Sequence, residues 1–278
     1  MPRGFLLREL ITDTPALIAA ALLCVLVLTA VFAPLIVPYD PLAVDLDSLK
    51  QPPGKAHFMG TDSKGRDILS RVIYGSRISL SIGIVAAFLS LCIGTILGMI
   101  AGYFGGKTDA MMSQAFDVIL AFPSLLLAIG ISAVMPPGLT SAMLAIVLVG
   151  WAGFARLVRG ITLSLKEQTY VEASRAFGAT SIRILFRHIL PNALPLLLVA
   201  SSLRVGGFIL IEASLSFLGL GVQPPTPTWG SMISLNRMYI NSAPWMVIFP
   251  GLAISITVIS FNILGDFLRD KLDPRFQG

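Results

Sequence analysis

The sequence has few of the residues that build disulfide frameworks and metal sites. Its 278 residues include two cysteines and two histidines. Cys24 and Cys92 lie inside apolar runs without paired spacing or a neighbouring histidine, so we expect two buried thiols rather than a disulfide or a zinc site. His57 and His188 have no carboxylate cluster beside them inside an apolar run. The sequence therefore offers no membrane-embedded catalytic site.

Charged residues are scarce as well. Asp, Glu, Lys and Arg make up 13% of the chain and hydrophobic residues 55%, which excludes an ordinary soluble domain. The net charge of +5 could suggest a nucleic-acid partner, but the basic residues are interspersed between apolar runs and form no continuous stripe. We therefore expect an all-α integral membrane protein that binds no nucleic acid and whose positive charge sets its topology.

Six apolar runs are long enough to cross a bilayer as helices. They are residues 16–37, 78–101, 112–135, 139–165, 191–217 and 244–264. A cleaved signal peptide is the alternative for the first run, but the run exceeds a signal core, and Pro34 follows Ala33 at the only suitable cleavage site. Basic residues, among them Arg3 and Arg275, are more frequent in the segments that six spans place inside. Both termini are therefore expected in the cytoplasm.

The segment 38–77 is polar and rich in turns. It holds His57, Asp62 and Asp67, which could suggest a metal site, but their spacing matches no fixed ligand pattern. The favoured interpretation is a hydrogen-bonded turn in which the aspartates cap helix starts and Arg66 pairs locally. We expect no metal here.

Glycines in and after the second run suggest close packing and a turn. Gly94, Gly98 and Gly102 recur every four residues, which predicts a bare helix face for close packing. Gly106-Lys107-Thr108 then imitates the end of a phosphate-binding P-loop, but a P-loop follows a buried strand and this segment follows a membrane-length run. We interpret it as a glycine-rich turn that binds no ATP.

Residues 214–233 are rich in glycine and proline, which should break any helix and form an external loop. Trp229, Tyr239 and Trp245 suit an aromatic belt at the membrane interface, with ordinary loop packing as the alternative.

A polar stretch, Lys166 to Pro191, separates the fourth and fifth runs. Tyr170, Ala173 and Phe177 recur at spacings of three and four, which predicts one apolar face on a short helix. Gly178 permits a turn, and a hydroxyl residue after it can cap a second helix. The pattern predicts a helix–turn–helix, and an amphipathic pair lying on the membrane surface is the alternative.

The same stretch resembles the EAA loop of permease subunits in ABC importers at Glu172, Ala173, Ser174, Gly178, Leu190 and Pro191. Ser174 stands where that family usually has a second Ala, and His188 stands where it usually has Ile. In that family the loop forms the cytoplasmic coupling helices that dock into a groove on the ATP-binding subunit. The resemblance implies that residues 166–191 couple this chain to such a subunit.

Three further segments narrow the resemblance. The GTD and GRD motifs within 60–67, residues 214–233 and the ending FNILGDFLRDKLDPR are similar to the C-type permease subunit of dipeptide, oligopeptide and nickel ABC importers. This implies a type I ABC importer transmembrane fold over 76–278, preceded by an N-terminal helix and external loop over 1–75. It also implies an inner-membrane assembly with a second homologous permease, two ATP-binding subunits that hold ATP and Mg, and an external substrate-binding protein. The chain itself would bind no cofactor and would not be an enzyme.

Arg204 and Glu212 lie inside the fifth run, where a charge costs at least about 2.5 to 3.5 kcal/mol and should face protein or water. They could line a translocation pathway, or pair with each other or with a partner subunit. The expected function is a permease for peptides, with nickel or another small solute as the alternative. An ion-coupled secondary carrier using these two charges is the less favoured alternative, because the sequence shows no convincing internal repeat.

Overall fold

The computed structural model describes residues 5–272, so Arg3 and Arg275 lie outside the described residues. The described part is helical and contains no strand. Its α-helices are α1 (Phe5–Thr12), α2 (Thr14–Ile36), α3 (Ile68–Phe104), α4 (Gly106–Leu120), α5 (Ser124–Ala133), α6 (Leu139–Lys166), α7 (Thr169–Ala176), α8 (Ser181–Ile184), α9 (Leu190–Phe217), α10 (Trp229–Asn236) and α11 (Trp245–Leu272). Shorter helical turns occupy Leu46–Ser48, Leu185–Ile189 and Arg237–Tyr239.

Five helical segments within residues 5–272 are long and apolar enough to cross a membrane: α2, α3, α6, α8 together with α9, and α11. α4 and α5 together make a sixth candidate, but they meet at an angle of 86°. The third predicted span, 112–135, is therefore broken in the middle, since α4 ends at Leu120 and α5 begins at Ser124. Pro123 accounts for the break because it has no N–H to donate and disfavours helical geometry in the residue before it.

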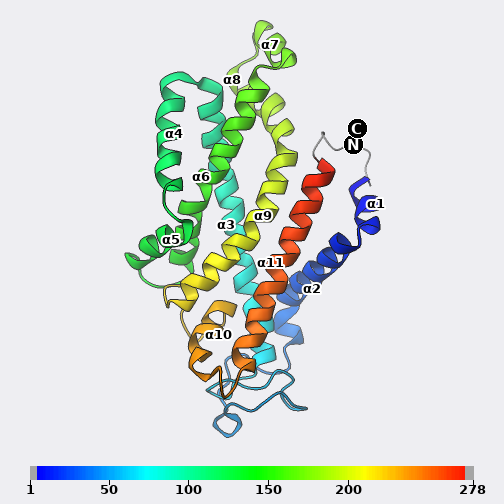
Figure 1. Ribbon diagram of the computed structural model, residues 1–278, viewed down its shortest axis with the longest axis vertical. Coiled ribbons are helices and arrows are strands. Elements are labelled where there is room, and N and C mark those ends of the chain that lie inside the picture. The colour runs from blue at the N-terminus through cyan, green and yellow to red at the C-terminus, as the bar shows by residue number, and fades with distance from the viewer. Residues whose placement is uncertain (1–4, 273–278) are drawn as a thin grey trace.

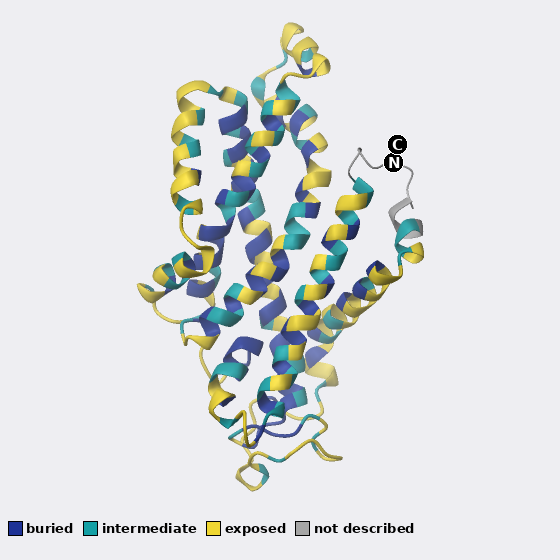
Figure 2. Cartoon of the chain, viewed as in Figure 1, coloured by how far each residue is buried: buried dark blue, intermediate teal, exposed yellow. Residues whose placement is uncertain are grey.

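The core lies where α3, α6 and α9 face one another, and Figure 2 shows buried residues concentrated on these central helices. α3 packs directly against α6 at Gly94, Gly98 and Gly102. A Cβ on Gly94 would lie 2.6 Å from the carbonyl oxygen of Trp151, and a Cβ on Gly102 would lie 2.8 Å from that of Arg159. No side chain fits at these distances, so the predicted bare face is confirmed.

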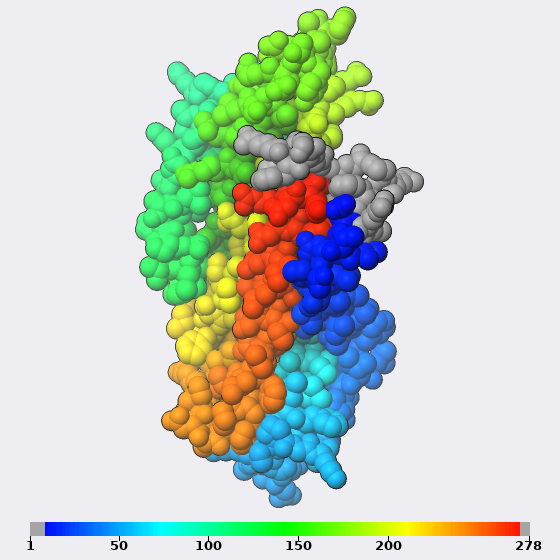
Figure 3. Space-filling view, turned by 45° about the vertical axis from the view of Figure 1, so that its right-hand side comes forward, coloured from blue at the N-terminus to red at the C-terminus, as the bar shows by residue number. Residues whose placement is uncertain are grey.

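The two ends of the bundle differ (Figure 1). α7 and α8 project at one end, and α10 lies at the other with the segment that joins α2 to α3. α1 and the last turn of α11 lie in the same half as α7. Figure 3 shows α1 and α2 against one side of α11, where Nζ of Lys271 lies 2.7 Å from Oε2 of Glu9. The first and last described helices are thus joined by an ion pair.

α3 begins at Ile68, well before the expected start at residue 78. The side chain of Asp67 caps the helix by accepting a hydrogen bond from the backbone N–H of Ser70 at 2.7 Å. Such a cap stabilises a helix start by about 1 kcal/mol. The prediction that an aspartate caps a helix at this place is confirmed.

Residues 214–233 were expected to hold no helix, and this is wrong. α9 extends into the segment, and α10 begins at Trp229 with a reciprocal cap between Thr228 and Ser231. Trp229 is fully buried, and its Nε1 donates to the carbonyl oxygen of Val72 at 3.0 Å. This tryptophan therefore packs inside the end of the bundle, as the alternative interpretation proposed.

The expectation of two buried thiols is wrong for Cys24, which is exposed, while Cys92 is partly buried. α2 packs through a narrow strip of buried residues that includes Ala16, Ala19 and Ala33. Its other faces are open on this chain. Hydropathy does not distinguish a helix face that packs against protein from one that meets lipid, because both are apolar.

Candidate functional site

The loop between α6 and α9 projects beyond the neighbouring spans (Figure 1). α7 ends at Ala176, after which Gly178 adopts a φ of +80° and its N–H donates to the carbonyl oxygen of Arg175 at 3.0 Å. Thr180 then caps α8 with its side chain. The helix–turn–helix predicted for this stretch is confirmed, with glycine at the one position that needs a left-handed backbone.

The loop is anchored through one face. Val171 of α7 and Ile184 of α8 are fully buried, and they pack in a cluster with Met99 of α3 and Val158 of α6. The apolar face expected from the sequence points elsewhere, because Phe177 is 91% exposed. Sequence reasoning missed Val171, since helical periodicity identifies an apolar face without showing what covers it.

The opposite face displays large apolar side chains. Phe177 at the turn, Ile182 and Phe186 are 91%, 70% and 58% exposed, and we call these three residues the docking face. Ile182 and Phe186 are four positions apart and so lie on one side of the second helix. The motif residues Glu172 and Ala173 are also exposed. A rigid base therefore carries an exposed apolar surface with charged neighbours.

The two positions that depart from the EAA pattern contact each other. Oγ of Ser174 lies 3.2 Å from Nε2 of His188, and both residues are half-buried. The contact joins α7 to the π turn Leu185–Ile189, which leads directly into α9. α9 then begins with Leu190, half-buried, and Pro191, exposed. The loop is thus connected to α9 by a side-chain contact as well as by the chain.

Glu212 of α9 is fully buried. Its carboxylate accepts hydrogen bonds from the hydroxyls of Ser216, at 2.8 Å, and Ser79 of α3, at 3.4 Å. The hydroxyl of Ser79 also accepts from the backbone N–H of Trp229, the first residue of α10. Glu212 therefore fastens α9 to α3 beside α10, and it presents no surface to a pathway in this conformation.

Arg204 lies on the same helix, but the structure does not bring it together with Glu212. It is exposed on the chain, and its guanidinium carbon lies 5.4 Å from the centroid of the Phe154 ring on α6. The guanidinium also lies against Gly153, where an added Cβ would be 2.9 Å from the guanidinium carbon. Of the two charges in this span, Arg204 is the one that can meet a group from outside the chain.

Residues 94–278 match the family described as binding-protein-dependent transport system inner membrane component. The chain belongs to this family. Residues 6–53 match the N-terminal TM domain of oligopeptide transport permease C. The protein is therefore a permease subunit of an ABC importer, in agreement with the family expected from its motifs.

Curated relatives match this permease over nearly its whole length. A glutathione transport system permease protein, GsiD, of Pectobacterium atrosepticum is 45% identical over 271 residues, covering 97% of this chain and 90% of the relative. A dipeptide transport system permease protein, DppC, of Alkalihalophilus pseudofirmus is 44% identical over 270 residues, covering 97% and 89%. Among solved structures, an inward-facing form of the MetNI methionine ABC transporter gives a TM-score of 0.61 at 20% identity, covering 74% of this chain and 98% of that one. This likeness shows a shared fold.

The GKT sequence of the permease does not form a P-loop. Gly105, with a φ of +66°, ends α3, and residues 106–108 are the first turn of α4. No strand precedes this turn in the part of the chain that the structure describes. The interpretation as a glycine-rich turn between two helices is confirmed.

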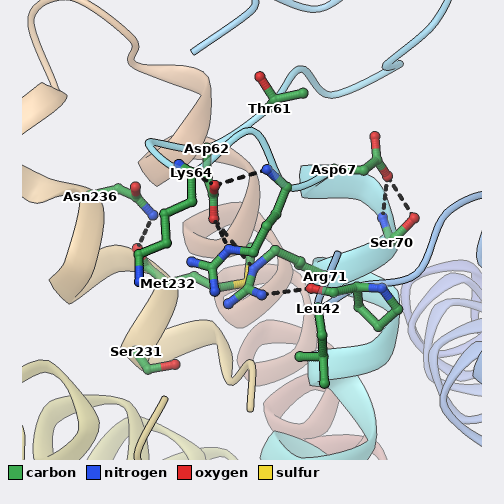
Figure 4. Close-up of polar contacts among 12 residues, drawn as sticks. Leu42, Thr61, Asp62, Lys64, Asp67, Ser70, Arg71, Ser231, Met232 and Asn236 are labelled. Atoms are coloured by element: carbon green, nitrogen blue, oxygen red, sulfur yellow. Dashed lines mark hydrogen bonds and ion pairs between the residues drawn. The ribbon is translucent and has the colours of Figure 1, made fainter. Parts of the chain in front are cut away.

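At the opposite end of the permease, the GTD and GRD motifs form a buried polar cluster (Figure 4). Oδ2 of Asp62 accepts from Nε of Arg66 at 2.7 Å and lies 3.7 Å from Nε of Arg71. Nη1 of Arg71 donates to the carbonyl oxygen of Pro41 at 2.7 Å. All three charged side chains are at least 95% buried. The predicted local pairing of Arg66 is confirmed, and the cluster holds the α2–α3 segment on the bundle.

The candidate metal ligands near this cluster do not converge. His57 contacts Asp67 at 2.9 Å, while Asp62 is bonded to arginine. Within residues 5–272, no group of three or more metal-ligating side chains forms. The aspartates serve as cap and counter-ion, as the favoured interpretation held.

Proposed function

We propose that this permease forms half of the translocation pathway of an ATP-driven importer of short peptides. The proposed substrate follows from the relatives, since one is named for glutathione and the other for dipeptides, at nearly equal identity and each over 97% of this chain. Both cargoes have a peptide backbone and a free carboxylate. Short peptides with a free carboxylate are therefore the substrate class that agrees with the names of both relatives.

The observation that carries the coupling role is the docking face. Phe177, 91% exposed at the tip of a firmly anchored loop, is a large apolar side chain outside the spans, and such side chains mark interaction surfaces. We assign the docking face, with Glu172, Ala173, Ser174 and Gly178, to an ATP-binding subunit. Leu190 and Pro191 begin the span that would receive the movement of the loop.

The proposed assembly contains this chain, a second homologous permease, two ATP-binding subunits and an external binding protein in the cytoplasmic membrane. ATP and Mg bind the ATP-binding subunits, and this chain hydrolyses nothing. Closure of the ATP-binding pair would move the loop at residues 166–191 and bias the spans between inward-open and outward-open states.

We also propose that both termini are cytoplasmic and that residues 1–75 are an addition to a transmembrane domain formed by 76–278. α1 and the end of α11 lie in the same half of the molecule as the coupling loop (Figure 1), which supports the orientation. α2 contacts the rest of the chain through one narrow buried strip, as expected of a helix added outside the central bundle.

Co-purification from bacterial membranes tests the coupling role. The tagged permease is extracted in mild detergent as the wild type, as Phe177→Asp and as Phe58→Asp, the last being a 69% exposed phenylalanine in the α2–α3 segment. We expect the ATP-binding subunits to accompany the wild type and Phe58→Asp but not Phe177→Asp, because a charge in an apolar contact opposes docking. Equal recovery with all three proteins would contradict the assignment.

A further inference from the structure

Arg204 lies at the middle of the membrane-spanning helix α9. It is 14 residues after the start of α9 and 13 before its end, which places it roughly 20 Å from either end of the helix. A guanidinium at that depth is costly in hydrocarbon, so it must meet water, protein or an anion.

The side chain is held against α6 without being covered. Its guanidinium lies over the ring of Phe154, which is 1% exposed, at a distance typical of a cation–π contact. Gly153 leaves the space in α6 that the guanidinium occupies, since a Cβ there would contact the charged group. Arg204 nevertheless remains exposed on the chain. The charge is therefore oriented by α6 and open on its other side.

No carboxylate of residues 5–272 forms an ion pair with Arg204. Glu212, the acidic residue of the same span, lies eight positions further on, about 12 Å along the helix, and is bonded to hydroxyls. An anion that pairs with Arg204 would therefore come from outside the described part of this chain.

We propose that Arg204 lines the translocation pathway and receives the C-terminal carboxylate of the peptide as it crosses the middle of the membrane. The inference rests on the proposed peptide substrate. That carboxylate has a pKa of about 3.5, so it is ionised at neutral pH, and every unmodified peptide carries it whatever its side chains. Guanidinium binds carboxylate through paired hydrogen bonds, so one residue can recognise peptides of different sequence.

The test uses the complete transporter in proteoliposomes with its binding protein and ATP. In a background with Cys24→Ala and Cys92→Ala, Arg204→Cys is treated with a thiosulfonate reagent that adds an ammonium group or with one that adds a sulfonate. Leu198→Cys is the matched control, because its side chain is 55% exposed on the same helix but points about 120° away. Labelling is followed by mass spectrometry and dipeptide uptake by radiolabel.

We expect Arg204→Cys to lower uptake about 10- to 100-fold, as for the loss of hydrogen bonds between charged groups. The ammonium reagent should restore most of it and the sulfonate reagent none, while Arg204→Lys should retain most uptake and Leu198→Cys should respond to neither reagent. Binding-protein-stimulated ATP hydrolysis in the untreated variant shows that the assembly is intact.

Unchanged uptake in Arg204→Cys, or equal effects of the two reagents, would overturn the inference. Failure of both reagents to label the introduced thiol, with or without ATP, would overturn it as well and would place this position against a partner subunit. If the wild-type transporter itself takes up no peptide while the thiol of the Arg204→Cys variant is still labelled, the proposed peptide substrate is wrong. That outcome is distinguishable from the two above, because it does not depend on Arg204.

Discussion

Arg159 of α6 binds Asp109 of α4 through two contacts, with Nε donating to Oδ1 and Nη2 to Oδ2 at 2.7 Å. The pair joins the first turn of α4 to the part of α6 that leads into the loop at residues 166–191. Both side chains are about two-thirds buried or more, with 32% of Arg159 and 17% of Asp109 exposed. Movement of the loop would therefore reach α4 as well as α9.

Removing the Asp109 charge should destabilise the permease. Asp109→Asn loses a paired, partly buried contact, which we expect to lower stability by about 1 to 2 kcal/mol after solvent screening. Asp117→Asn is the matched control. Asp117 pairs with Arg156, but their side chains are 65% and 53% exposed respectively, so this ion pair contributes little to stability. Thermal unfolding in detergent should show a shift of a few degrees for Asp109→Asn alone. Equal shifts in both variants would contradict the role given to the Asp109 pair.

Gly178 should be needed for its backbone conformation rather than for space. An L-residue at its φ of +80° costs about 1 to 2 kcal/mol, more for a β-branched one, yet a Cβ there meets no atom within 4 Å. Gly178→Val should reduce peptide uptake more than Gly178→Asn, because asparagine tolerates this conformation. Gly106→Val, at a positive φ with equally open surroundings, should retain uptake per assembled complex. Full uptake by Gly178→Val would count against the docking model.

The glycine stripe of α3 should tolerate no side chain. A Cβ on Gly98 would collide with the backbone carbonyl of Ala155, so Gly98→Ala must separate α3 from α6. At Gly160 of α6 a Cβ meets nothing within 4 Å, and alanine there gains helix propensity. We expect Gly98→Ala to lower the yield of folded protein in detergent and Gly160→Ala to leave it unchanged. Similar yields would show that α3 and α6 are less closely packed.

Asp62 should be essential for folding at the end of the bundle that carries the α2–α3 segment. Asp62→Ala leaves the buried guanidinium groups of Arg66 and Arg71 without a counter-ion, and breaking such a buried pair costs about 3 to 5 kcal/mol. The matched control is Asp47→Ala, an exposed aspartate of the same segment. Limited proteolysis from outside the cell should cut the segment in Asp62→Ala only. If Asp62→Ala resists proteolysis as well as the wild type, the buried cluster is not needed to hold the α2–α3 segment in place.

Much of the fold could be predicted because the signals are local. Helix caps and turns depend on neighbouring residues, and so the helix–turn–helix with Gly178 and the cap by Asp67 followed from the sequence. The glycine face of α3 could be predicted as well, since residues spaced four apart lie on one face of any helix. The family followed from motifs that occur in order along the chain.

The predictions were wrong or incomplete where burial and contacts depend on residues that are far apart in the sequence. A helix in a membrane has apolar residues on the faces that meet protein and on those that meet lipid, so the exposure of Cys24 could not be predicted from the sequence. Val171 was missed as the anchor of the loop because its partners come from α3 and α6. The pairing of Arg204 with Phe154 and the burial of Glu212 among hydroxyls also depend on helices far apart in the sequence.

Peptide uptake into proteoliposomes tests the central claim most directly. The permease is reconstituted with the subunits that co-purify with it, and uptake of a radiolabelled dipeptide is measured with internal or external ATP, with binding protein, and with a proton gradient alone. We predict uptake only when ATP reaches the ATP-binding subunits and the binding protein is present on the opposite side. Uptake by this chain alone, driven by the proton gradient without ATP, would contradict the account.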